Sequence, residues 1–167
     1  ENEAVVFMCT NCFTSVSIGD NGVQTAAVRF ALPPKGDLQT QQWLPYWVYE
    51  AQVRILERET QGRSDWQASD IQWAKPLRMA VPAWEISMQV AEDVGSRFVQ
   101  RQPVVKFVER PEAAYMAPAV VTPDDALRLL EFIVLAIEAR RRDWLKAIDF
   151  RIKAGEPELW AMPQGGF

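Results

Sequence analysis

The sequence contains no histidine among its 167 residues. This absence excludes Ser-His-Asp and Cys-His nucleophile pairs, every histidine-ligated metal site and the commonest general base. The glycine-rich phosphate loops, the nucleophile elbow and the calcium-binding EF-hand loop are also missing as motifs. No pair of residues therefore stands out as the acid and the base of an enzymatic reaction.

Basic residues and long hydrophobic runs are scarce as well. The chain has 18 Lys and Arg against 22 Asp and Glu, a net charge of −4. Because phosphate contacts supply most non-specific affinity for nucleic acids, this balance argues against a general nucleic-acid binder. The richest apolar stretch, residues 129–139, is interrupted by Glu131 and Glu138. We therefore expect no membrane span.

What is present is the composition of an ordinary globular protein, with 49% hydrophobic and 24% charged residues. A chain of this length buries about 70% of its unfolded surface, so its core needs no disulfide or metal to form. The stiff and polar segment 33–42 is predicted to divide the chain into a small module over residues 1–34 and a main domain over residues 43–163.

The small module is predicted to be a hairpin unit. β-branched and aromatic residues predict strands over residues 4–8, 14–18 and 23–32. Cys9 and Cys12 lie between the first two strands. The pair Asn21-Gly22, which favours a tight hairpin turn, lies between the second and the third.

The main domain is predicted to be an antiparallel sheet. Apolar and polar residues alternate over residues 46–58, which indicates a strand with one buried face. Further strands are expected at residues 77–81, 104–108, 148–152 and 159–162. The segment 155–157 is expected to join the last two as a hairpin.

Two helices are predicted to pack on this sheet. The first carries an apolar stripe of Ile86, Val90, Val94 and Phe98, with Gly95 weakening its middle. The second begins with Thr122 as N-cap and Pro123 in the first turn. Its predicted core residues are Leu127, Leu130, Ile133, Val134 and Ile137. The expected fold class is α+β: an antiparallel sheet of about five or six strands with two packed helices, plus an N-terminal ribbon-like β-hairpin.

Cys9-Thr10-Asn11-Cys12 is the one motif that carries recognisable chemistry. Two thiolates at this spacing can point at one metal ion, as in the knuckle of a structural zinc site, which makes Cys9 and Cys12 candidate ligands and zinc the candidate cofactor. They fill half of a tetrahedral site, so the other ligands lie outside this chain or are absent. A redox pair is a second interpretation, although strand-like residues follow Cys12 where a thioredoxin-like motif has a helix. Inert cysteines are the third.

The segment 5–13, a strand that enters this knuckle, resembles together with the following hairpin the second half of a zinc ribbon. In many bacterial proteins such a ribbon precedes an uncharacterised domain, and the segment 44–47 is similar to the start of that domain. The resemblance covers residues 5–32 and departs from the family at Phe13, where glycine is usual. Since a ribbon needs a second Cys-x-x-Cys, the resemblance implies a first knuckle upstream of Glu1, a pair supplied by a second chain, or a site that has decayed to a metal-free hairpin.

Two further groups of residues are predicted to bind a partner. Trp43 and Tyr46 are expected to be surface aromatics, a residue type common at interface hot spots. Arg140, Arg141 and Arg142 suit an acidic partner, although they also complement the dipole at the end of a helix.

These observations together predict a non-catalytic interaction or scaffold subunit of a larger assembly, with a protein partner or a homo-oligomer. The alternative is a thiol redox protein or another enzyme that uses Cys9 and Cys12. Two cysteines that no structural disulfide is expected to join point to a reducing compartment, and hence to the cytoplasm.

Overall fold

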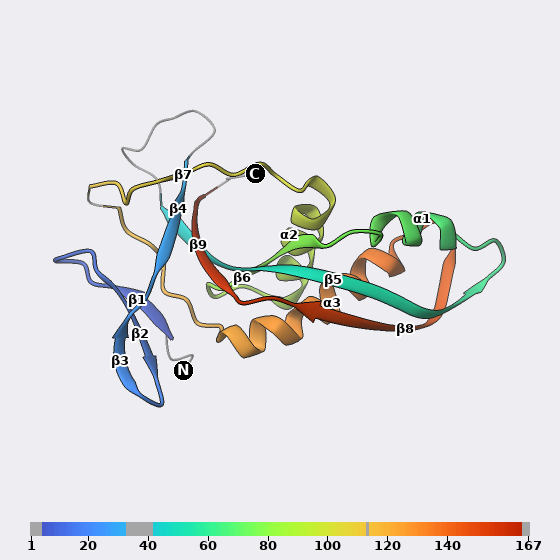
Figure 1. Cartoon of the computed structure of the whole chain (residues 1–167), viewed down its shortest axis with the longest axis horizontal. Coiled ribbons are helices and arrows are strands. Elements are labelled where there is room, and N and C mark those ends of the chain that lie inside the picture. Colours follow the sequence, from blue (N-terminus) through green and yellow to red (C-terminus); the bar gives the residue numbers. More distant parts are fainter. Residues whose placement is uncertain (1–4, 33–41, 113, 165–167) are drawn as a thin grey trace.

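One long strand, β5 (Trp43–Gln61), organises the fold. In the computed structural model, which describes residues 5–32, 42–112 and 114–164, β5 pairs with β9 (Glu158–Pro163) along its first half and with β8 (Trp144–Ala154) along its second half. On its other side, the first half pairs with β6 (Leu77–Pro82). The second half and β8 therefore form a two-stranded arm that extends from the body of the molecule (Figure 1).

The segment 155–157 does not form the predicted hairpin. Both β8 and β9 run antiparallel to β5 along the same edge, with Ala154 opposite Ala51 and Glu158 opposite Val48. The backbone N–H of Gly155 donates to the carbonyl of Glu50 across 2.9 Å, which keeps the chain on β5 through the bend. A hairpin prediction failed here because β5 is long enough to pair with both strands in succession.

The larger sheet has six strands in the order β6-β5-β9-β4-β7, with β8 added on β5, and the α+β fold class is confirmed. It is a mixed sheet, since β4 (Val28–Ala31) lies parallel to β9 while β7 (Phe107–Val108) is antiparallel to β4. The predicted strand over residues 23–32 breaks at residues 26 and 27, so its second half belongs to the larger sheet. Of the predicted dividing segment 33–42, only Gln42 lies within the described residues.

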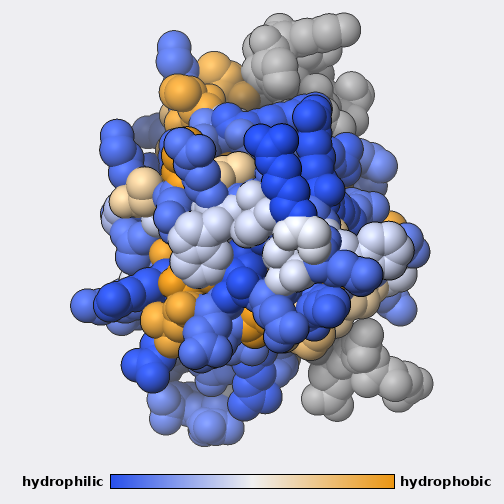
Figure 2. Space-filling view, turned by 90° about the vertical axis from the view of Figure 1, so that its right-hand side faces the viewer, coloured by the Kyte–Doolittle hydropathy of each residue, from blue (hydrophilic) through white to orange (hydrophobic). Residues whose placement is uncertain are grey.

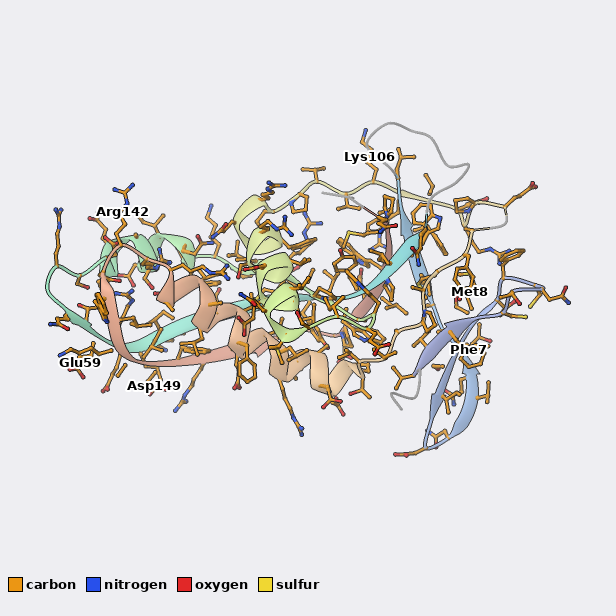
Figure 3. All side chains as sticks on the ribbon, turned by 180° about the vertical axis from the view of Figure 1, so that it is seen from behind. Phe7, Met8, Glu59, Lys106, Arg142 and Asp149 are labelled. Atoms are coloured by element: carbon orange, nitrogen blue, oxygen red, sulfur yellow. The ribbon has the colours of Figure 1, made fainter. Side chains whose placement is uncertain are left out.

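Two long helices, α2 (Met88–Arg101) and α3 (Pro123–Ala139), pack on this sheet (Figure 3), and α2 contributes side chains to the apolar clusters on both of its faces. The Thr122 hydroxyl accepts a hydrogen bond from the backbone N–H of Asp125 at 3.0 Å, which confirms the predicted N-cap. A third helix, α1 (Trp66–Gln72), was not predicted because its seven residues are mostly polar and form no apolar stripe. No helix within the described ranges is long and apolar enough to cross a membrane.

The main core lies between α3 and the face of β5 that carries Trp47, Tyr49, Ala51 and Val53. Four of the five core residues predicted for α3 are buried, whereas Leu127 is 42% exposed. A second apolar cluster covers the opposite face of the first half of β5, where Tyr46 and Val48 pack with Phe98 of α2 and Trp160 of β9. The first half of β5 is therefore buried on both faces.

The small N-terminal sheet contains β1 (Val6–Met8), β2 (Ser15–Gly19) and β3 (Gly22–Thr25) in antiparallel order. Gly22, at the tip of the predicted turn, has a φ of 85°, a left-handed conformation that glycine adopts without strain. The sheet is held to the main domain through β1, since Val6 and Met8 belong to the main core. The backbone N–H of Ala119 also donates to the carbonyl of Val6 across 2.8 Å.

Candidate functional site

Cys9 and Cys12 lie on the loop that joins β1 and β2, and their side chains come within 3.5 Å of each other. The loop continues the hairpin: the backbone N–H of Cys9 donates to the carbonyl of Thr14 at 2.9 Å, and that of Phe13 donates to the carbonyl of Cys9 at 2.8 Å. Cys12 is exposed and Cys9 is half-buried, and both are free thiols. This backbone turn places two soft ligands side by side at the surface.

The loop closes through Phe13, which has a φ of 56°. This left-handed conformation is costly for a bulky residue, whereas a glycine would adopt it without strain. Arg110 supports it: the guanidinium donates to the carbonyl of Cys12 at 3.2 Å and to that of Phe13, and lies 5.7 Å from the centre of the Phe13 ring. Contacts from a residue far away in the sequence thus hold the turn without the glycine.

The Cys12 thiol is more acidic than an ordinary cysteine. Its hydrogen bonds with the side chain and the backbone of Thr14, and with Cys9, lower its pKa from 9.0 to about 7. A large fraction of Cys12 is therefore thiolate at neutral pH, the form that binds metals and attacks electrophiles. Within the described part of the chain, no group of three or more His, Cys, Asp or Glu side chains is arranged to hold a metal ion.

A cleft of about 660 Å³ opens beside the small sheet, where that sheet meets β9 and the start of α3. Its walls are largely apolar and include Ile18, Trp47 and Leu159. Arg29 and Glu158 also line it and form an ion pair of 2.8 Å. On the neighbouring surface of the small sheet, Ile18 lies opposite Val23, and these side chains are 51% and 67% exposed. Ile18 and Val23 therefore form an apolar surface at the end of β2 that lies away from the loop carrying Cys9 and Cys12.

Trp43 and Tyr46 are not surface aromatics, which corrects their predicted role in partner binding. Their exposed fractions are 1% and 7%. Trp43 packs edge-on against Phe30, and Tyr46 against Trp84. The prediction for Tyr46 failed because it assumed one solvent-exposed face for β5, whereas the start of this strand is covered on both sides. The prediction for Trp43 failed because the predicted strand began at residue 46, whereas β5 begins at Trp43 and places this residue in the main core.

Arg140, Arg141 and Arg142 do not form one basic surface. Arg140 forms an ion pair with Asp93 of α2, and the mostly buried Arg141 forms one with Glu138 at 2.7 Å. Arg142 is exposed and points away from the body at the end of the arm (Figure 3). Because the chain turns from α3 toward β8 at these positions, the three side chains diverge. The end of the arm presents a mainly hydrophilic surface with small separate hydrophobic areas (Figure 2).

A buried ionic cluster near the outer end of the arm was missed by sequence reasoning. Arg58 of β5 donates to Glu138 of α3 through Nε at 2.8 Å and to Asp143 through Nη2 at 2.7 Å. The three side chains are at most 1% exposed. No local sequence pattern predicts this site, because Arg58 and Glu138 are 80 residues apart. In the sequence, Glu138 is only a single charged residue within an apolar helix.

Every carboxylate of this cluster has further donors. The Trp73 indole N–H and the Arg141 guanidinium both reach Glu138 Oε1, at 2.8 and 2.7 Å. Although burial alone would raise it, these bonds hold the pKa of Glu138 below its usual value. The Arg58 guanidinium lowers the pKa of Asp143 to about 2. A closed and fully paired cluster of this kind joins α1, β5, α3 and β8 and serves the structure of the arm.

Comparison with protein-family models, with curated proteins and with solved structures finds no match to this chain.

Proposed function

We propose that this chain is a non-catalytic interaction subunit in which Cys9 and Cys12 provide half of a structural zinc site. The separation of 3.5 Å between the two cysteine side chains carries the proposal. Zn–S bonds of about 2.3 Å in a tetrahedron place two sulfur atoms about 3.8 Å apart, so the loop needs little rearrangement to bind zinc. The lowered pKa of Cys12 favours the same outcome, because zinc binds the thiolate.

Two further ligands complete this site from outside the described residues, on another segment or on a partner protein. The exposed Ile18 and Val23 and the adjoining cleft support the second source, because they supply an apolar contact surface on the same small sheet, at the end of β2 away from the cysteine loop. Free thiols that bind zinc suit a reducing compartment, which supports a cytoplasmic location.

Titration with Co²⁺, which reports thiolate coordination through its charge-transfer absorption, tests this proposal. We expect a thiolate band that is lost in Cys9→Ser and in Cys12→Ser and kept in Thr10→Ser, a change at an exposed position in the same loop. A band with the intensity of four thiolates at one metal per two chains would identify a second copy as the partner. Absence of any thiolate band, alone or with a candidate partner, would contradict the proposal.

Thiol–disulfide exchange is a second candidate function, favoured by the acidity and exposure of Cys12. The Cys12 thiolate would attack a substrate disulfide and release one substrate thiolate. The Cys9 thiolate would then displace the second, which leaves a Cys9–Cys12 disulfide and a reduced substrate. Alkylation of the metal-free protein measures the required thiol: Cys12 should reach half of its maximal rate near pH 7, and Thr14→Val should raise this midpoint. Efficient reduction of a model disulfide would favour this function, whereas alkylation suppressed by stoichiometric zinc would favour the structural one.

A further inference from the structure

Strand β8 has one edge without a partner among the described residues. Its eleven residues pair only with β5, and it forms the border of the arm (Figure 1). An open edge of this length offers unpaired backbone N–H and C=O groups to another strand. Natural edge strands are usually shielded by charged side chains, by proline, by β-bulges or by a covering element. The side chains of β8 determine which strand this edge can accept.

The two faces of β8 differ in character. Phe150 lies opposite Ile55 and Ile152 opposite Val53, and both pack against the main core beneath α3. The gap between α3 and the edge of β8 is lined by apolar side chains that include Leu135 and Ile148. Alternation places Asp149, Arg151 and Lys153 on the other face, which none of the described helices covers, and Figure 3 shows Asp149 directed away from the helices.

Within the chain, Asp149 and Arg151 face like charges, whereas Lys153 lies opposite Gln52. Asp149 lies opposite Glu57, and Arg151 lies opposite Arg54. No ion pair of Asp149 or Arg151 occurs among the described residues. Like charges directly opposite each other destabilise a strand pair. The opposite charges that these two residues lack on β5 are therefore expected on the free side of β8.

We propose that a second copy of this chain supplies them, through antiparallel pairing of two β8 strands about a two-fold axis at Phe150. In this register each Asp149 faces Arg151 of the second copy, twice by symmetry, and each Ile148 faces Ile152 on the apolar face. A two-fold axis one residue earlier would place two Asp149 side chains opposite each other, and one residue later two Arg151 side chains. The charge pattern thus selects a single register, and the interface is self-complementary as an isologous dimer requires.

This dimer is independent of the proposed zinc site. The small sheet with the cysteine hairpin and β8 lie toward opposite ends of the long axis (Figure 1). Charge reversals on β8 should leave Co²⁺ binding unchanged, and Cys9→Ser should leave this dimer intact. Failure of one proposal can therefore be distinguished from failure of the other.

Sedimentation equilibrium of the full chain, combined with charge reversal, tests the dimer. We expect Asp149→Arg alone and Arg151→Asp alone each to weaken dimerisation about tenfold or more, because each places two like-charge pairs across the interface. The double variant should restore the dimer, and an equimolar mixture of the two single variants should form a heterodimer. Lys106→Asp, a matched reversal at an exposed position away from β8, should have no effect.

The single variants should remain folded, since each turns a like-charge pair with β5 into an opposite-charge pair. Thermal unfolding checks this independently of association. A wild-type chain that stays monomeric at about 100 μM would overturn the proposal. A dimer whose dissociation constant is unchanged by both charge reversals would also overturn it. Failure of the two single variants to form a heterodimer when mixed would do the same.

Discussion

Replacing Arg58 by methionine removes the cation at the centre of the buried cluster. Methionine has a similar length and keeps the apolar contacts of the side chain, so the change isolates the charge. Glu138 and Asp143 would then remain buried with Arg141 as their one cation, which leaves an uncompensated negative charge. Breaking a buried ion pair in this way costs about 3–5 kcal/mol in the free energy of unfolding.

Urea unfolding at pH 7 measures this loss. With an m-value of about 2 kcal/mol/M, the midpoint should fall by about 2 M relative to the wild type. Arg54→Met is the matched control, because Arg54 is exposed on the same strand and its loss should change stability by less than about 0.5 kcal/mol.

The pH dependence separates this charge effect from a packing effect. In the wild type, the pKa of Asp143 is depressed from 3.8 to about 2, so its contribution is present above pH 4 and is lost as the pH falls toward 2. In the variant, the unpaired carboxyl groups should have raised pKa values and bind protons in the folded state. The difference in stability from the wild type should therefore shrink as the pH is lowered from 7 to 4. A loss below about 1 kcal/mol that does not vary with pH would refute this reasoning.

Three further predictions concern the helices. Gly95→Ala should lower the free energy of unfolding by about 1–3 kcal/mol despite the better helix propensity of alanine, because the added Cβ would lie 2.3 Å from Cδ1 of the buried Ile133. Chemical denaturation measures this loss, and adding Ile133→Val, which removes that Cδ1 atom, should recover part of it. Thr122→Ala should cost about 1 kcal/mol through loss of the bond from the Asp125 N–H, and a change below a few tenths would show that the cap contributes nothing. Ile133→Ala should cost about 2–5 kcal/mol and Leu127→Ala much less, since only the first is buried; equal losses in thermal unfolding would contradict the assignment of the inner face of α3.

Features that depend on neighbouring residues could be predicted from the sequence. Thr122 and Pro123 predicted the start of α3, because a cap bond and a fixed φ act within one turn. The turn beside Gly22 and the cysteine loop followed in the same way from short-range geometry. Alternation over residues 46–58 predicted β5 and the side chains of its core face, since side-chain direction has a period of two in any strand.

Features that depend on which elements meet were decided only by the tertiary structure. The burial of Tyr46 follows from β5 being covered on its even-numbered face as well, which the alternation of the strand itself does not record. The bend at 155–157 depends on the length of β5, and the same three residues would have suited a hairpin between isolated strands.

The Arg58 cluster and the contact of Gly95 with Ile133 show the physical reason most directly. Each joins residues that are tens of positions apart, and neither residue type is unusual in its local sequence. Sequence periodicity records how one segment divides its side chains between two faces. The periodicity contains no information on how close the neighbouring element lies or which charges it carries. These two properties determine whether the buried Glu138 is paired and whether Gly95 can be replaced by a larger residue.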